Sequence, residues 1–226
     1  MKIQPEKLYL ELMKKTLAFT LWPEPPIPIE ISAYGPVKRF LISAVLNILR
    51  TKKLMLYKKN SVSVDEKING QMIWPAYADT MIGIKRLDNL QYCIETVVSE
   101  KIEGDLIETG VWRGGACIFM RAVLAAYGIE NRKVFIADSF EGLPKPNVEK
   151  YPIDKGDKHY TYNFLAVSQV EVENNFKKYG LLDDKVVFLK GWFKDTLPSA
   201  PLERISILRL DGDMYGSTMD ALESLY

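Results

Sequence analysis

The segment Asp105-Leu-Ile-Glu-Thr-Gly-Val-Trp-Arg-Gly-Gly115 decides the fold of this 226-residue chain. It begins with a short apolar run typical of a buried strand, and its glycines precede a helical pattern formed by Ile118, Met120, Val123 and Leu124. A strand followed by glycines and a helix is typical of a nucleotide-binding loop, because the helix N-terminus presents free amides to a ligand. A tight turn that serves only packing would give the same pattern.

Apolar strands and helices continue to alternate after this segment. We expect strands at 133–138, 185–189 and 205–211, and a helix at 170–179. Strands separated by helices predict a doubly wound, parallel α/β sheet with its ligand crevice at the carboxyl ends of the strands. Residues at those ends are therefore the first candidates for a site.

The loop after the first strand differs from the dinucleotide fingerprint GxGxxG, because Trp112 occupies the position of the second glycine. This difference disfavours NAD as the ligand. Glu108, at the end of the first strand, suits a cofactor with a positively charged amino-acid end. Asp138 ends the second strand, where a carboxylate can accept both hydroxyls of a ribose. The two acids and the loop together predict an adenosine site.

Aromatic and small residues follow the second and third strands. Ser139 and Phe140 come directly after the second strand, and Gly191, Trp192 and Phe193 follow the third. These residues would border the adenine ring. Aromatic side chains after strands more often belong to the core, which is the alternative for each of them.

Asp211-Gly-Asp213 ends the fourth strand and places two carboxylates over the crevice. Oxygen ligands of this kind suit a hard cation such as Mg²⁺, which would lower the pKa of a substrate hydroxyl. An Asp-x-Asp motif also occurs in metal-dependent glycosyltransferases, and it can be a turn with solvated acids. The position after a strand favours a site.

Five motifs follow one another in the second part of the chain. They are Thr80-Met-Ile-Gly-Ile-Lys-Arg-Leu-Asp-Asn89, residues 108–115, Ala137-Asp-Ser-Phe-Glu-Gly-Leu-Pro144, Gly191-Trp-Phe-Lys-Asp-Thr-Leu-Pro198 and Leu208-Arg-Leu-Asp-Gly-Asp-Met-Tyr-Gly-Ser-Thr218. Jointly they resemble the motifs of the TylF/MycF family of macrocin-type sugar O-methyltransferases. The resemblance covers residues 80–226. It implies a class I methyltransferase (Rossmann-like) fold and methylation of a sugar hydroxyl with S-adenosylmethionine and Mg²⁺.

The resemblance also implies the site. Glu108 and Gly110 would line the methionine end of the cofactor, and Asp138 would hold the ribose. Asp211 would serve as metal ligand and general base, with Asp213 as a second metal ligand. The full set of expected cofactor-binding residues is Thr80, Met81, Glu108, Gly110, Val111, Arg113, Asp138, Ser139, Phe140, Gly191, Trp192 and Phe193. The acceptor would be a sugar, a glycosylated natural product or a polysaccharide.

The sequence departs from the family pattern at its C-terminal end. Family members continue past the helix near Thr218 into a fifth strand with further metal-binding acids, and then into two more strands. This sequence ends at Tyr226. We therefore expect a C-terminally truncated fragment with an incomplete sheet, weak metal binding and no activity by itself.

Residues 1–79 are predicted to form a helical N-terminal extension of the methyltransferase domain at 80–226. Apolar spacing predicts helices at 8–21, at 37–57 and at 87–98, and a Pro-rich linker separates the first two. The second helix is amphipathic and basic. Between Glu30 and Asp65 there are seven Lys and Arg and no acid, leaving 23 bases against 29 acids elsewhere, a net charge of −6.

Two interpretations of this basic helix remain open. It would pack on its own domain or on a second subunit of a homo-oligomer, or the segment Val37 to Lys59 would hold the protein peripherally on an anionic inner membrane face. The N-terminal 22 residues lack the apolar core of a secretory signal, and no apolar run is long enough to span a membrane. We expect a cytoplasmic protein.

Composition narrows the remaining functions. A net charge of only +1 disfavours nucleic acid as a partner. Cys93 and Cys117 are predicted to be buried, reduced thiols. His159, the only histidine, lies in a Lys- and Tyr-rich loop and is not assigned as the base. The alternatives to a methyltransferase are a non-catalytic adenosine-binding scaffold and a glycosyltransferase that uses Asp211 and Asp213.

Overall fold

The computed structural model describes residues 4–29, 34–71 and 75–226 of the chain. Its centre is a four-stranded parallel sheet, which consists of β3 (Asp105–Thr109), β4 (Val134–Asp138), β5 (Val186–Lys190) and β6 (Ile205–Leu210). The sheet confirms the four predicted strands to within a residue or so at each end. Each is a short apolar run bounded by turn residues, so the sequence signal was strong.

The strand order in this sheet is β5-β4-β3-β6. The chain runs from β3 outwards to β4 and β5 and then returns to pair β6 with the other edge of β3. In doubly wound sheets, such a reversal opens a crevice at the carboxyl ends of the strands. Thr109 is in register with Ala137 and Leu210, so the loops after β3, β4 and β6 begin at the same edge.

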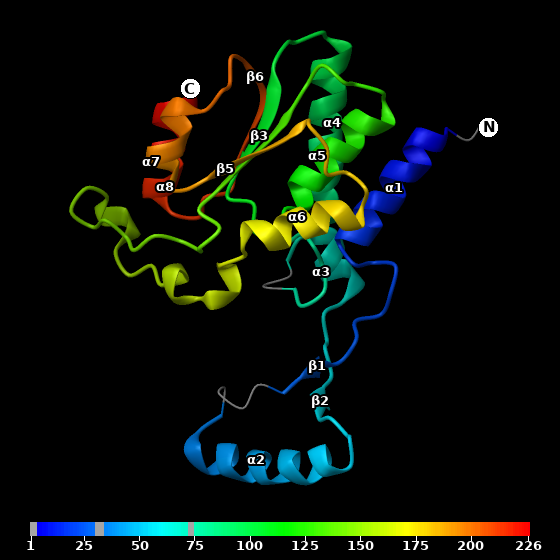
Figure 1. Ribbon diagram of the computed structural model, residues 1–226, viewed down its shortest axis with the longest axis vertical. Helices are drawn as coiled ribbons and strands as arrows, with labels where there is room; N and C mark the ends of the chain where they lie inside the picture. The colour runs from blue at the N-terminus through cyan, green and yellow to red at the C-terminus, as the bar shows by residue number, and fades with distance from the viewer. Residues whose placement is uncertain (1–3, 30–33, 72–74) are drawn as a thin grey trace.

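Helices cover both faces of the sheet (Figure 1). One face carries α1 (Pro5–Leu17), α4 (Gly83–Ser99), α5 (Gly115–Ala126) and α6 (Gln169–Lys178), and the other carries α7 (Phe193–Thr196) and α8 (Tyr215–Leu225). Because side chains alternate along a strand, Leu106 packs in the larger core with α1, α4 and α5, and its neighbour Ile107 packs in the smaller core with α8. The remaining short elements in the loops are Pro152–Asp154, His159–Thr161, Asn163–Leu165 and Leu197–Ser199.

α1 belongs to the larger core, although the sequence placed it in an extension. Leu10 and Leu17 are fully buried in the core that contains α5, and Lys14 forms an ion pair with Asp88 of α4. α1 therefore shares one hydrophobic core with α5, and the division of the chain at residue 80 stays a prediction. The helix ends before the predicted residue 21, because Phe19 adopts a left-handed φ of 53°.

α2 (Pro36–Thr51) lies apart from the sheet, at the end of an antiparallel ribbon of β1 (Ile27–Pro28) and β2 (Tyr57–Lys58) (Figure 1). None of its residues is buried. It ends at Thr51 rather than at the predicted residue 57, since Lys53 has a φ of 56°. We call residues 34–59 the arm.

A buried ion pair fixes the base of the arm. Lys67 of α3 (Val64–Asn69) contacts Glu24 at 2.6 Å, and both side chains are almost fully buried. Asn60 donates to the other Glu24 oxygen at 2.8 Å. Glu24 precedes β1 and Asn60 follows β2, so both ends of the ribbon are held at one point.

Two further features bear on the predictions. No helix in the described ranges is long and apolar enough to cross a membrane. Cys117 is buried as predicted, whereas Cys93 is only partly buried, because it lies near the solvent side of α4.

Candidate functional site

A cavity of about 470 Å³ opens at the carboxyl ends of the strands, within the volume range of small-molecule sites. Its wall is formed by the turns after β3, β4, β5 and β6 and by the long connection between β4 and α6. The sequence-predicted residues on this wall are Met81, Gly110, Asp138, Ser139, Gly191, Trp192, Phe193, Asp211 and Asp213. Residues far apart in the sequence therefore share one cavity, and their ligand contacts stay predictions.

The turns after β3 and β6 touch each other at Gly110. This residue has a φ of 84°, and a Cβ there would lie 2.2 Å from the carbonyl oxygen of Asp211. Only glycine fits this approach. Trp112 and Asp213, also on the wall, have φ values of 48° and 57°. Left-handed backbone at non-glycine residues tends to gather at functional sites.

Asp138 connects two of the loops that form the cavity. One carboxylate oxygen accepts the Val111 amide and the other accepts the Phe140 amide, each at 2.8 Å. Burial raises the pKa of Asp138, and these amide hydrogen bonds oppose that rise. The Trp112 amide and the Ser139 hydroxyl, 3.4 Å from Oδ1, also lower this pKa, so the hydroxyls of a ligand would share the carboxylate with protein donors.

Glu108 lies beneath the cavity rather than on its wall. It is 2% exposed and forms an ion pair with Arg209, its neighbour across β3 and β6. Cys117 donates its thiol to the other Glu108 oxygen at 2.8 Å. Burial raises the pKa of Glu108 to about 7, with the positive charge of Arg209 opposing the rise. Arg209 also donates to Asp211 at 2.8 Å and thereby joins the two acids.

Besides Glu108, four predicted cofactor residues lie outside the main cavity. Thr80 and Val111 line a small void of about 30 Å³ together with Glu108. Arg113 donates to the carbonyl oxygens of residues 75, 76 and 78 and holds that segment. Phe140 is 5% exposed and packs near Phe188. These side chains support the loops, and none of the four touches the main cavity.

Asp211 and Asp213 are the two acids after β6 on the wall of the cavity. Burial raises the pKa of Asp213, and the negative charge of Asp211 raises it further. Within the described ranges, no group of three or more His, Cys, Asp or Glu side chains is placed to hold a metal ion. A cation here would need ligands beyond these two carboxylates.

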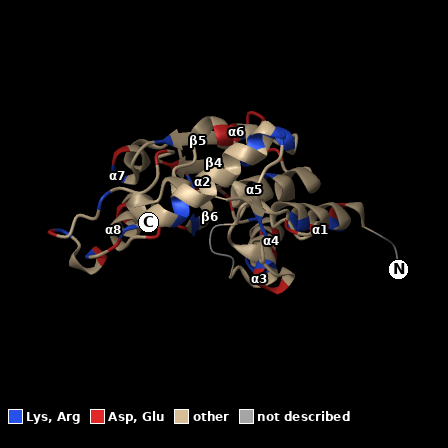
Figure 2. Ribbon diagram, turned by 90° about the horizontal axis from the view of Figure 1, so that it is seen from below, with Lys and Arg blue, Asp and Glu red and all other residues tan. Residues whose placement is uncertain are grey.

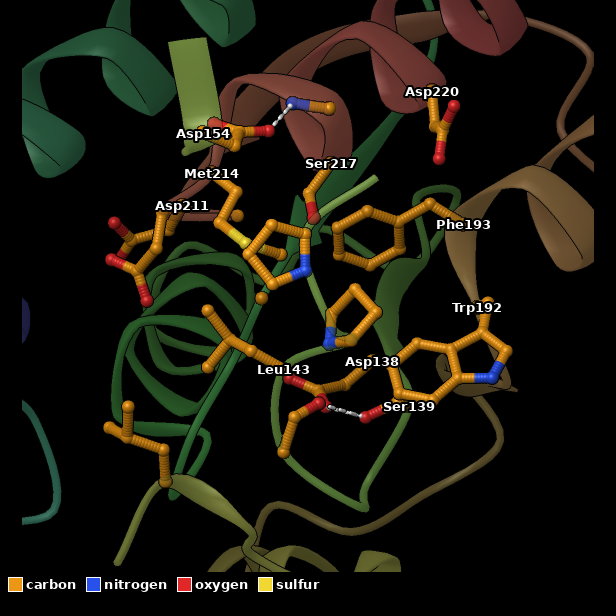
Figure 3. Close-up of a pocket in the computed structure, with 18 of the residues that line it drawn as sticks. Asp138, Ser139, Leu143, Asp154, Trp192, Phe193, Asp211, Met214, Ser217 and Asp220 are labelled. Carbon is orange, nitrogen blue, oxygen red and sulfur yellow. Dashed lines mark hydrogen bonds between the residues drawn. The ribbon is translucent and has the colours of Figure 1, made fainter. Parts of the chain in front are cut away.

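Most of the remaining wall was not predicted from the sequence. The connection between β4 and α6 supplies Leu143, Asn147, Tyr151 and Asp154, and the start of α8 supplies Ser217. Figure 3 shows Asp211 and Trp192 on opposite sides of the cavity, with Leu143 between them. Its place in the chain could have indicated these residues, because this connection begins at the carboxyl end of a strand, where ligands bind in such sheets.

His159 lies in the same connection but does not line the cavity. Its Nδ1 contacts Asp157 Oδ2 at 2.9 Å, and its side chain is 45% exposed. In this structure the histidine is therefore paired with Asp157 and stands off the cavity wall.

The fold and the cavity define the chain as an α/β protein of the class I methyltransferase type. The sequence profile described as "Macrocin-O-methyltransferase (TylF)" matches residues 6–226. The chain belongs to this family and is an O-methyltransferase.

Named relatives agree with this membership. The chain is 46% identical over 219 residues to the 8-demethyl-8-(2,3-dimethoxy-alpha-L-rhamnosyl)-tetracenomycin-C 4'-O-methyltransferase of Streptomyces olivaceus, covering 96% of this chain and 74% of the relative. It is 44% identical over 220 residues to the demethyldecarbamoylnovobiocin O-methyltransferase of Streptomyces niveus, covering 97% and 74%. The solved structure of the O-methyltransferase NovP superposes with a TM-score of 0.80 at 42% identity, over 98% of this chain and 78% of that one.

Proposed function

We propose that this chain transfers a methyl group from S-adenosylmethionine to a hydroxyl of a saccharide, free or attached to a natural product or polysaccharide. One observation carries the proposal: Asp138 at the end of β4 and Asp211 after β6 line the same cavity. The first suits a ribose and the second a hydroxyl that must lose its proton. The names of the relatives, which are O-methyltransferases of sugar-bearing natural products, support this choice of acceptor.

The cofactor would occupy the side of the cavity between the turns after β3 and β5. S-Adenosylmethionine would supply the methyl group. Asp138 would accept ribose hydroxyls beside the protein donors that already bond to its carboxylate. Trp192 and Phe193 would flank the adenine, since both line the cavity after β5. Glu108 would act indirectly, through its ion pair with Arg209, rather than as a direct ligand.

The acceptor hydroxyl must be deprotonated as it is methylated. Asp211 would accept this proton at Oδ1, because Arg209 already donates to Oδ2. Mg²⁺ would make the hydroxyl more acidic. Asp211 and Asp213 would provide two of its ligands, and substrate oxygens and water would provide the others, as is usual for this ion. The raised pKa of Asp213 beside Asp211 fits a place for a cation.

The test uses two proteins, this chain and a form of it extended by the further C-terminal strands that the family resemblance implies. Each is combined with isotope-labelled S-adenosylmethionine and a panel of saccharide acceptors, read by mass spectrometry, and the variants below are made in whichever form turns over. Asp211→Asn should lower turnover by at least about 100-fold, the usual contribution of a general base. EDTA should abolish turnover and Mg²⁺ should restore it. Asp184→Asn, which changes an exposed acid remote from the cavity, is the matched control and should leave turnover unchanged.

Three results would contradict parts of this proposal. Full turnover in EDTA would remove the metal. Full turnover of Asp211→Asn would remove the base. Binding of S-adenosylhomocysteine without turnover on any acceptor, in the extended form as well, would instead favour a scaffold that binds adenosine.

A further inference from the structure

The connection between β4 and α6 is fastened to the start of α8 by one buried carboxylate. Asp154 is 8% exposed, although it lies in the middle of a surface connection of 30 residues, 139–168. Its Oδ1 accepts the Tyr215 amide and its Oδ2 accepts the Gly216 amide, both at 2.9 Å. Figure 3 shows Asp154 directed at the first turn of this helix.

Asp154 takes the place of a local helix cap. α8 has 11 residues, and Met214 at its N-cap position makes no side-chain capping bond. The first amides of a helix have no partners within the helix, and they favour a negative charge. A residue about 60 positions earlier in the chain supplies both acceptors and the charge.

Gly216 and two tyrosine rings pack closely around the contact between Asp154 and α8. A Cβ on Gly216 would lie 2.8 Å from the Tyr151 ring and 3.2 Å from Asp154 Oδ2, so the close approach requires glycine. The rings of Tyr151 and Tyr215 stack edge to face at 5.7 Å. Lys150 approaches Asp220 of α8 at 4.0 Å, a weaker and more exposed contact.

This fastening joins two walls of one cavity. The connection contributes Leu143 and Tyr151 to the wall, and the segment that leads into α8 contributes Asp211 and Asp213. A shift of the connection away from α8 would therefore widen the cavity on the side of these acids. Asp138, where we place the ribose, lies at the start of the connection and keeps its own amide bonds.

We propose that Asp154 is a positioning residue, which holds this connection against α8 and thereby shapes the acceptor side of the cavity. That this side of the cavity binds the acceptor rests on the function proposed above. The contact between Asp154 and α8 does not depend on that function.

Hydrogen exchange measured by mass spectrometry tests the fastening in the whole chain. Asp154→Ala should speed exchange in residues 143–165 and at the amides of Tyr215 and Gly216 by about tenfold or more, since it removes two hydrogen bonds to a charged group. Asp154→Asn keeps one acceptor and should give a smaller increase. Asp157→Asn is the matched control, because its carboxylate bonds only to His159 in the same connection.

Kinetics separate positioning from a merely structural role. With the acceptor found by the panel, Asp154→Ala should raise the acceptor KM by about tenfold. The affinity for S-adenosylhomocysteine should stay within about threefold of the original in the same protein, because each amide contact of Asp138 remains.

Two outcomes overturn the proposal. Unchanged exchange in Asp154→Ala and Asp154→Asn would show that the carboxylate does not hold the connection. Faster exchange with an unchanged acceptor KM would show that it does not shape the site. If neither this chain nor its extended form methylates any acceptor, the function proposed above fails and the exchange result alone decides the fastening.

Discussion

α5 and α2 show what an amphipathic pattern leaves undecided. Both were predicted as helices from apolar spacing, and both are helices in the structure. Ten of the 12 residues of α5 are buried between the sheet and its neighbours, whereas none of the 16 residues of α2 is buried. The spacing of apolar residues therefore predicts that a helix has an apolar face, and it does not tell which surface covers that face.

The charges of the two regions differ as well. Arg121, the charged residue of α5, pairs with Asp183 at 2.5 Å. The arm carries seven Lys and Arg and no acid, and Figure 2 shows how the charges are distributed over the chain. Burial in α5 requires each charge to be paired, while exposure on α2 allows an unbalanced set.

The largest expected difference between the two regions is in stability. Ile118 on α5 is fully buried and Ile48 on α2 is 62% exposed, so they form a matched pair. Ile118→Ala should lower the free energy of unfolding by about 2–5 kcal/mol, because it leaves a cavity in the core. Ile48→Ala should change it by less than about 0.5 kcal/mol. Chemical denaturation measures both, and equal losses would show that α2 is covered in solution.

The two regions also differ in how their stability depends on pH. Every carboxylate with a shifted pKa lies outside the arm, which contains no acid. The pKa of Glu108 in the folded chain is about 7, raised by burial from 4.5. The folded state therefore holds this proton more tightly than the unfolded state. This difference stabilises the folded state by on the order of 3 kcal/mol below about pH 4.5, and the stabilisation is lost as the pH rises towards 7. Unfolding of Glu108→Gln, compared with the original chain from pH 4.5 to 7.5, should lack this slope; identical slopes would contradict it.

Cofactor binding should depend on the sheet and not on the arm. Asp138→Ala should weaken the binding of S-adenosylhomocysteine by about 1.5–3 kcal/mol, the range for hydrogen bonds to a charged group. Titration calorimetry measures this loss. The double variant Lys52→Glu with Lys53→Glu in the arm serves as the control and should bind normally. Unchanged affinity of Asp138→Ala would remove this residue from the site.

The smallest expected effect is on binding of the arm to an anionic membrane. If the arm binds an anionic membrane, each Lys or Arg near the surface contributes about 1 kcal/mol. The chain should then sediment with anionic liposomes at low salt, and reversal of Lys52 and Lys53 to Glu should abolish this. Reversal of Lys177 and Lys178, an adjacent pair on α6, is the control and should have no effect.

The same experiment distinguishes the second interpretation of the arm. A chain that stays in the supernatant with anionic liposomes would contradict membrane binding. Sedimentation velocity would then test the predicted homo-oligomer. Phe40 is 76% exposed on α2. A dimer that dissociates in the Phe40→Glu variant would indicate that the arm contacts a second copy of the chain.

The strands and the ends of the strands were predictable because their signals are local. The run from Asp105 to Thr109 is recognisable from five residues, and Asp138 is placed by the strand that it ends. The partners of these side chains were not predictable in the same way. Arg209 reaches Glu108 from a strand about 100 residues away, and nothing near either residue indicates the pair.

The sequence by itself determined the alternation of strands and helices, the family and the acids at the carboxyl ends of β4 and β6. It did so because strand period, glycine turns and motif order are properties of neighbouring residues. Tertiary structure decided that Glu108 is paired with Arg209, that α1 joins the core, that the described part of the chain buries no residue of α2, and that Asp154 caps a helix far along the chain. These contacts depend on how distant segments pack, and packing is set by the whole chain at once.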